Sequence, residues 1–104
     1  MTDVRRKSGS EVLQKPRSKE RIEDLWKVVL HNDDYTPMEF VVEVLEEIFD
    51  RSPAEAYRIM MQVHIEGRGI AGAYAHEVAE TKAHTTVDLA REAGFPLFAS
   101  VEEG

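Results

Sequence analysis

Three short stretches of this chain are typical of strands, and in two of them apolar and polar residues alternate with a period of two. The first, residues 25–31, is rich in β-branched and aromatic side chains, which is typical of a strand. The last, residues 97–101, shows the same alternation. The middle stretch, residues 70–75, consists of small residues around Gly72. We expect a strand in each, with a helix packed closely against Gly72.

Three other stretches place apolar residues at helical spacing. Residues 36–39 (TPME) and 52–55 (SPAE) each offer a hydroxyl cap, a proline for the first helical position and a glutamate three residues after the hydroxyl. These patterns predict two helices that begin with capping boxes. Gly67 is expected to end the second helix, and Gly94 the third, which spans residues 76–93. The expected buried stripes are Phe40, Val41, Val44, Leu45 and Ile48, then Ala56, Ile59, Met60 and Val63, then Ala79, Ala83, Val87 and Ala90.

The elements follow one another as strand, helix, helix, strand, helix, strand. A chain of 104 residues has room for a single domain. We therefore expect an α+β fold in residues 23–104, with a three-stranded antiparallel sheet packed against three helices. Residues 1–22 are expected to form a flexible basic arm in front of this core domain.

Charge separates the arm from the core. Residues 1–21 contain seven Lys or Arg and three acidic residues, a net charge of +4, while the remaining residues carry a net charge of −11. The arm has few apolar residues, so it is expected to be disordered when free. It also lacks interleaved aromatic residues, which favours a solvated tail over a nucleic-acid-binding segment.

The composition excludes several other classes of protein. The chain has no cysteine, which rules out disulfides, thiol catalysis and a cysteine zinc site. No apolar run approaches the ~20 residues of a membrane span. The charged N-terminus has no hydrophobic region of a signal peptide, so the cytoplasm is the expected location and no membrane partner is expected.

Candidate chemistry gathers where the first strand meets the first helix. Asn32, Asp33 and Asp34 lie on a short tether between these two elements, and such junctions often build sites in small domains. On the second helix, His64 continues the apolar stripe that contains Met60. A histidine in that position is more often a satisfied structural group than a functional one.

Together with later segments, these residues resemble the ClpS adaptors of bacterial Clp proteases. The motifs are residues 32–41 (NDDYTPMEFV), 60–67 (MMQVHIEG), 77–82 (EVAETK) and Pro96-Leu97. The resemblance covers roughly residues 25–103. Because the motifs are long, ordered and correctly spaced, it is specific.

The resemblance implies a binding module rather than an enzyme, with no cofactor and no metal. Members bind the free N-terminal residue of N-degron substrates, which is Leu, Phe, Tyr or Trp, and deliver them to a ClpA-like or ClpC-like AAA+ unfoldase, whose N-terminal domain they contact. We expect a monomer. By resemblance, Asn32, Asp33, Asp34 and His64 bind the α-amine, Leu30, Thr36, Met38, Val41, Met60, Val63 and Leu97 form the hydrophobic pocket, and Glu77, Thr81 and Lys82 bind the unfoldase.

The residue types suit these implied roles. An α-ammonium has only hydrogen-bond donors, whereas Asn32, Asp34 and neutral His64 each offer an acceptor. Methionines such as Met38 and Met60 adapt to guests of different shapes, so one pocket could accept both leucine and aromatic side chains.

Two other interpretations compete with the adaptor. A small metal-dependent hydrolase could use Asp33, Asp34 and His64, since two carboxylates and a histidine can hold a divalent cation. Alternatively, the acidic residues only form a turn. Against the hydrolase, residues 76–80 (HEVAE) begin like a zinc-protease motif but lack its second histidine. We rank the adaptor first, the turn second and the hydrolase last.

Overall fold

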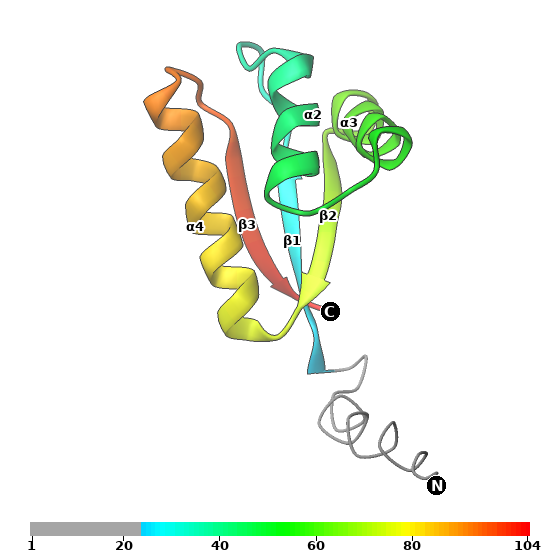
Figure 1. Ribbon diagram of the computed structural model, residues 1–104, viewed down its shortest axis with the longest axis vertical. Helices are drawn as coiled ribbons and strands as arrows, with labels where there is room; N and C mark the ends of the chain where they lie inside the picture. The colour runs from blue at the N-terminus through cyan, green and yellow to red at the C-terminus, as the bar shows by residue number, and fades with distance from the viewer. Residues whose placement is uncertain (1–23) are drawn as a thin grey trace, which may run out of the picture.

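The structure, a computed structural model, describes residues 24–104. The predicted arm, residues 1–22, lies outside the described residues. The order of the helices and strands in residues 24–104, and the pairing of the strands, confirm the predicted α+β fold class, with three helices and a three-stranded antiparallel sheet. The elements are β1 (Trp26–His31), α2 (Met38–Glu47), α3 (Pro53–Glu66), β2 (Arg68–Tyr74), α4 (His76–Glu92) and β3 (Phe98–Glu103) (Figure 1).

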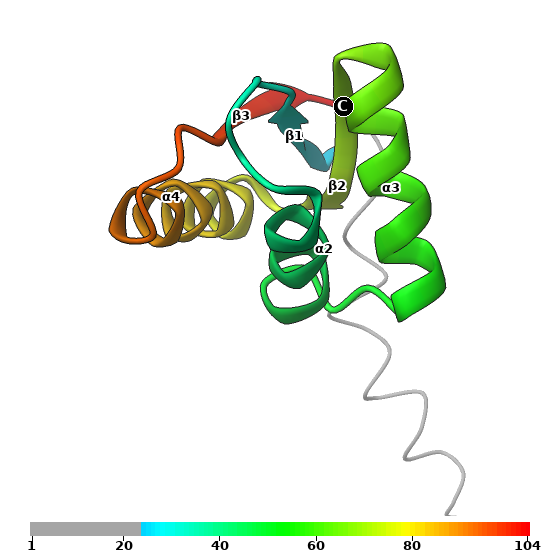
Figure 2. The same cartoon turned by 90° about the horizontal axis from the view of Figure 1, so that it is seen from above.

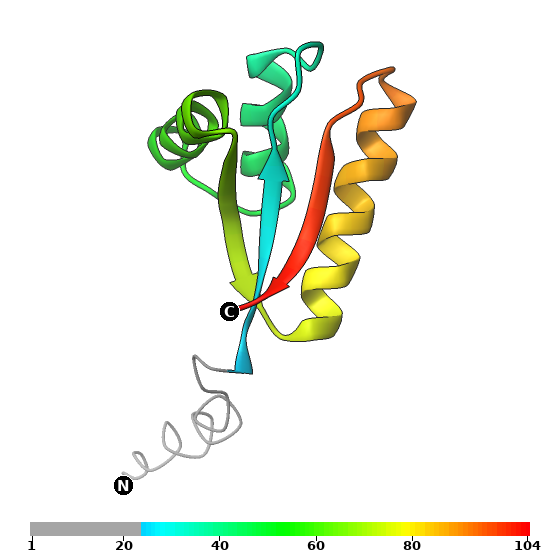
Figure 3. The same cartoon turned by 180° about the vertical axis from the view of Figure 1, so that it is seen from behind.

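The strand β1 is the centre of the sheet, which has the order β2-β1-β3. Both neighbours pair with β1 in antiparallel fashion, and the register with β2 shifts between Val28 and Val29. Seen from above, the helices lie to one side of the sheet, with α3 alongside β2 (Figure 2). The view from behind shows the other face without a covering helix (Figure 3). Among residues 24–104, no helix is long and apolar enough to cross a membrane.

The core lies between the sheet and the helices. Val28 and Leu30 of β1 are fully buried there, together with Leu45 of α2 and Leu97 before β3. Burying each such side chain contributes about 1.5–3 kcal/mol. Leu30 is the last residue of β1 that faces the helices. Because it is buried in this core, packing fixes the end of β1 that leads into the turn at residue 32.

The two predicted capping boxes have different outcomes. At Ser52 the box is confirmed, because the side chains of Ser52 and Glu55 each accept the other's backbone N–H. The prediction of a capping box formed by Thr36 and Glu39 is wrong. The helix α2 begins at Met38 with Pro37 as its cap and without a side-chain cap hydrogen bond. The Thr36 hydroxyl instead donates to Asp33, since a carboxylate is a stronger acceptor partner.

The nearest neighbour of Gly72 belongs to β2 itself and not to a helix. A side-chain carbon at this position would collide with the ring and hydroxyl of Tyr74. The glycine therefore makes room for a side chain of its own strand.

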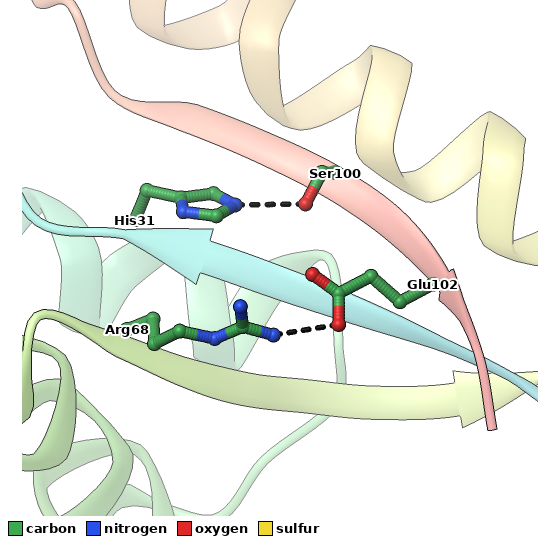
Figure 4. A network of polar contacts seen from close by, with 4 residues as sticks. All are labelled: His31, Arg68, Ser100 and Glu102. Carbon is green, nitrogen blue, oxygen red and sulfur yellow. Dashed lines mark hydrogen bonds and ion pairs between the residues drawn. The ribbon is translucent and has the colours of Figure 1, made fainter.

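Polar side chains make two contacts on the open face of the sheet (Figure 4). Arg68 of β2 and Glu102 of β3 form an ion pair of 2.6 Å that spans β1 diagonally, since their partners in β1 are His31 and Lys27. Val29 lies between these two positions and is 0% exposed. Beside the pair, His31 Nε2 lies 2.7 Å from the Ser100 hydroxyl. The ion pair thus joins the two outer strands to each other across β1, and the His31 contact joins the end of β1 to β3.

Candidate functional site

The turn between β1 and α2 is organised by Asp33. Its Oδ1 accepts the backbone N–H groups of Tyr35 at 2.8 Å and Thr36 at 2.7 Å. Its Oδ2 accepts the Thr36 hydroxyl at 2.8 Å. Both carboxylate oxygens are therefore engaged within the turn, and the neighbouring side chains of Asn32 and Asp34 are exposed.

The charge of Asp33 is stabilised in this setting. Burial alone would raise the pKa of its carboxyl group, but the hydrogen bonds from Thr36 and Tyr35, helped by the positive charge of Arg91, lower the pKa below 3.8. Arg91 is held in place because its guanidinium donates to the carbonyl oxygens of Phe95 and Leu97, each at 2.9 Å. The turn thus carries a negative charge at neutral pH.

A backbone hydrogen bond joins the turn to the end of α3. The Asn32 N–H donates to the carbonyl oxygen of Gly67 at 2.9 Å. Gly67 follows the last residue of α3 in the left-handed conformation, with a φ of 94°, which glycine adopts without steric cost. His64 lies in the last turn of the same helix, so the link sets the position of His64 relative to Asn32.

A cavity of about 290 Å³ opens between the turn, the start of α2 and the end of α3. We call it the main cavity. It brings together nine of the sequence-predicted site residues, although they come from two separate stretches of the sequence, residues 32–41 and 60–64. Its lining consists of Asn32, Asp33, Asp34, Thr36, Met38, Val41, Met60, Val63 and His64.

The lining of the main cavity has a polar part and an apolar part. Asn32, Asp34 and His64 are exposed and supply oxygen and nitrogen acceptors. Val41, Met60 and Val63 belong to the hydrophobic core and form the apolar part. Met38 stays 42% exposed at the start of α2. The cavity therefore offers both a site for a cation and a site for an apolar group.

Two predicted pocket residues lie elsewhere. Leu30 is fully buried in the core and does not line the main cavity. Leu97 lines a small adjoining cavity of about 10 Å³, which shares Thr36, Val41 and Val63 with the main cavity. The structure thus places both leucines behind the lining residues and not at the surface of the main cavity.

The three residues implied to bind the unfoldase come together on α4. Glu77, Thr81 and Lys82 line a shallow depression with Val78, whose side chain is 44% exposed. Lys82 also contacts the end of α2, where its ammonium donates to the Ile48 carbonyl oxygen at 2.7 Å. It also lies 5.2 Å from the centre of the Tyr74 ring. Lys82 therefore helps to join α4 to the end of α2.

The geometry gives little support to a metal site. Among residues 24–104, no three His, Asp or Glu side chains come together as metal ligands. On α4, His76 pairs with Glu80 at 3.2 Å, and the cavity that Glu80 and His84 line does not include His76. The Asp33 oxygens are already used by the turn.

Three contributors to the site were missed by reasoning from the sequence. They are the carbonyl group of Gly67, the guanidinium of Arg91 and the exposed Val78. The sequence predicts Gly67 as a helix stop and as the end of the motif at residues 60–67, but nothing local in the sequence pairs it with Asn32. Val78 could have been noticed, because it is an apolar residue that does not share the buried stripe of Ala79 and Ala83.

Comparisons with known proteins identify the family that this chain resembles. The family described as "ATP-dependent Clp protease adaptor protein ClpS" matches residues 21–100. A ClpS adapter of Desulfatibacillum aliphaticivorans is 52% identical over 92 residues, 88% of each chain. One of Maricaulis maris is 50% identical over 95 residues, 91% of this chain and 87% of the relative. The solved structure of Agrobacterium tumefaciens ClpS2 bound to L-phenylalaninamide matches with a TM-score of 0.75 and 44% identity, over 79% of this chain and 99% of that chain.

Proposed function

The chain belongs to the ClpS family of ATP-dependent Clp protease adaptors, and we propose that its main cavity binds the free N-terminal residue of N-degron substrates. The observation that carries the proposal is the composition of the cavity wall. Exposed acceptors from the turn and from α3 face the same space as a buried apolar surface. An N-terminal residue presents the matching pair of groups, an ammonium and a side chain.

The α-ammonium is proposed to bind at the polar part. It carries three N–H donors and no acceptor, so its best partners are groups that accept hydrogen bonds. Asn32 offers an amide oxygen, Asp34 a carboxylate and His64 a ring nitrogen when it is neutral. Asp33 adds negative charge nearby, while its hydrogen bonds keep the turn in shape.

The N-terminal side chain is proposed to enter the apolar part. Val41, Met60 and Val63 are nearly inaccessible to solvent and present carbon and sulfur atoms only. Methionine conforms to guests of different shapes, which suits Leu, Phe, Tyr and Trp alike. The similar Agrobacterium protein was solved with L-phenylalaninamide, a compound with a free α-amine and a large apolar side chain.

The expected affinity is moderate. Burying one large apolar side chain contributes about 1.5–3 kcal/mol, and each charge-assisted hydrogen bond about 1.5–3 kcal/mol. Association costs at least ~4 kcal/mol. The balance corresponds to a dissociation constant on the order of micromolar, which also permits release of the substrate.

Delivery is proposed to use α4. Glu77, Val78 and Thr81 form an exposed surface that would contact the N-terminal domain of a ClpA-like or ClpC-like unfoldase in the cytoplasm. Lys82 would support this surface through its hydrogen bond to Ile48. In this account the protein works as a monomeric adaptor and performs no catalytic step. Neither the hydrolase nor the turn without function explains the apolar part of the cavity.

The test is a titration of the intact chain with peptides that differ only in their first residue. Peptides that begin with Leu, Phe, Tyr or Trp should bind with micromolar affinity, and those that begin with Ala, Glu or Lys should not. Asp34→Asn should weaken binding, whereas Asp88→Asn on α4 makes the same charge change away from the main cavity and should not. Equal binding of all peptides, or equal effects of both variants, would contradict the proposal.

A further inference from the structure

A second cavity, of about 390 Å³, lies between α4 and β3. Its lining contains Ala99 and Val101, whose side chains face the helices, and also Phe98 and Ser100, whose side chains face the open side of the sheet. Residues of both faces line one cavity only if the cavity runs along the edge of the strand. Among residues 24–104, β3 is an outer strand that pairs only with β1. This space, which we call the edge groove, follows the opposite edge of β3, its free edge within the described part of the chain.

The backbone groups at the free edge can be assigned from the pairing of β1. The Gly104 N–H donates to the Leu25 carbonyl oxygen, whereas the Asn32 N–H donates to Gly67 on the side of β2. Odd-numbered residues of β1 therefore bond β3, and hydrogen bonds alternate along an antiparallel pair. Ser100 lies opposite Val29, so it bonds β1. Ala99 and Val101 direct their N–H and C=O groups away from β1, into the edge groove.

Acidic side chains stand above this edge. Glu80 and Asp88 line the edge groove from α4, with His84 one turn from each. All three side chains are exposed. Eight residues of an α-helix span about 12 Å, so the two carboxylates are separated by about that distance along the groove. The groove thus fits an extended segment that has basic side chains on one face.

The chain contains such a segment immediately before the described residues. Lys15, Arg17, Lys19 and Arg21 occupy every second position, so an extended strand would carry all four on one face. In a strand, Arg17 and Arg21 would be about 13 Å apart, close to the separation of Asp88 and Glu80. Pro16 and the lysines are residues that outer strands tolerate.

The connection to β1 is long enough. Leu25 bonds Gly104 just after β3, so the chain enters β1 beside one end of the edge groove. A strand added outside β3 lies two strand spacings from β1, about 9.5 Å. The four residue steps from Arg21 to Leu25 can span about 13 Å.

We propose that residues 15–21 add to the free edge of β3 as a fourth strand, parallel to β3, with Arg21 beside Glu80 and Arg17 beside Asp88. The partner of the edge groove is thus a segment of the same chain. The docked segment would lie along α4, the helix that also carries Glu77 and Thr81, without covering the main cavity.

The test is residue-resolved amide hydrogen exchange of the intact chain by NMR. Docking protects the N–H groups of Ala99 and Val101, while those of Phe98 and Ser100 are bonded to β1 with or without the arm. In Arg17→Glu/Arg21→Glu, exchange at Ala99 and Val101 should become about tenfold faster or more, with Phe98 and Ser100 unchanged. Arg5→Glu/Arg6→Glu makes the same charge change elsewhere in the arm and should have no effect.

Restoring the charge pairs adds a stricter requirement. Glu80→Lys/Asp88→Lys combined with Arg17→Glu/Arg21→Glu should recover the slow exchange. Equal rates at Ala99 and Val101 in the intact chain and in Arg17→Glu/Arg21→Glu would overturn the proposal. So would protection that rises with protein concentration, which would indicate a second copy at the edge, or changes that appear equally at Phe98 and Ser100, which would indicate a change in global stability.

Discussion

The Asn32 N–H donates to the Gly67 carbonyl oxygen at 2.9 Å and so joins the two halves of the main cavity. Asn32 begins the acidic turn, and Gly67 caps the helix that carries His64. The polar acceptors are therefore positioned relative to one another by the backbone before any ligand binds. Such preorganisation lowers the entropic cost of binding.

Gly67→Ala should affect both stability and binding. Gly67 has a φ of 94° with no atom near the place of an added side-chain carbon, so alanine would bring backbone strain of about 1 kcal/mol without a collision. Relief of the strain would shift the Gly67 carbonyl, and with it the spacing of Asn32 and His64. We expect about fivefold weaker binding of a Phe-initiated peptide, measured by titration.

Gly94→Ala is the matched control for this change. Gly94 has a φ of 86° and equally free surroundings, but it does not line the main cavity. It should lower the melting temperature by a similar amount and leave peptide affinity unchanged. If both variants bound peptide normally, the link between Asn32 and Gly67 would not determine the geometry of the site.

Asp33→Ala should destabilise the fold in a pH-dependent way. The hydrogen bonds of the turn hold the pKa of Asp33 below 3.8, so its ionised form is favoured in the folded state. The resulting stability is fully present above the pKa of the unfolded chain, about 3.9, and is lost as the pH falls through the folded value. We expect the variant to lose about 1–2 kcal/mol at pH 7 and the difference to shrink below about pH 4.

Denaturant unfolding of both chains between pH 3 and pH 7 measures this effect. Asp34→Ala serves as the control, since the neighbouring carboxylate is exposed and should contribute little to stability. A difference between the intact chain and Asp33→Ala that stayed constant down to pH 3 would argue against an ionised Asp33 as the anchor of the turn.

Met38→Ala should widen the choice of N-terminal residue. Met38 lines the main cavity from the first turn of α2, where it would crowd the stiff β-branched side chains of Val and Ile. Its removal should allow peptides beginning with Ile or Val to bind. Because Met38 is 42% exposed and alanine favours helices, stability should change little.

Met60→Ala is the contrasting variant, since Met60 is 4% exposed and its truncation should cost about 2–5 kcal/mol. Melting temperatures and affinities for Leu-, Ile- and Val-initiated peptides decide the role of Met38. A Met38→Ala variant that is much less stable, with an unchanged preference for Leu over Ile, would make Met38 a core residue only.

Much of the fold followed from local sequence patterns. Apolar periodicity predicted five of the six elements, and a run of small residues predicted β2. Gly67 and Gly94 both adopt the positive φ angles expected of helix stops. The two capping patterns show the limit of such reasoning. Ser52 forms its box, but Thr36 does not, because Asp33, only three residues away, competes for the hydroxyl.

The site could be predicted only in part. Its residue set followed from a resemblance to a family, and the structure gathers nine of those residues around one cavity. The position of His64 was harder to predict, since the apolar stripe continues through it while the structure leaves it exposed. The contact of Lys82 with Ile48 joins residues 34 positions apart, and no local pattern encodes such a contact.

The most direct test of the account compares a Phe-initiated peptide with its N-acetylated form in a titration of the intact chain. Acetylation removes the positive charge and leaves Asp34 facing a neutral amide, so we expect a loss of about 2–5 kcal/mol, which is about 30-fold or more in Kd. Asp34→Ala should reduce the affinity of the free peptide by a similar factor and should scarcely change that of the acetylated one. Equal binding of the free and acetylated peptides would show that the main cavity does not recognise the α-amine.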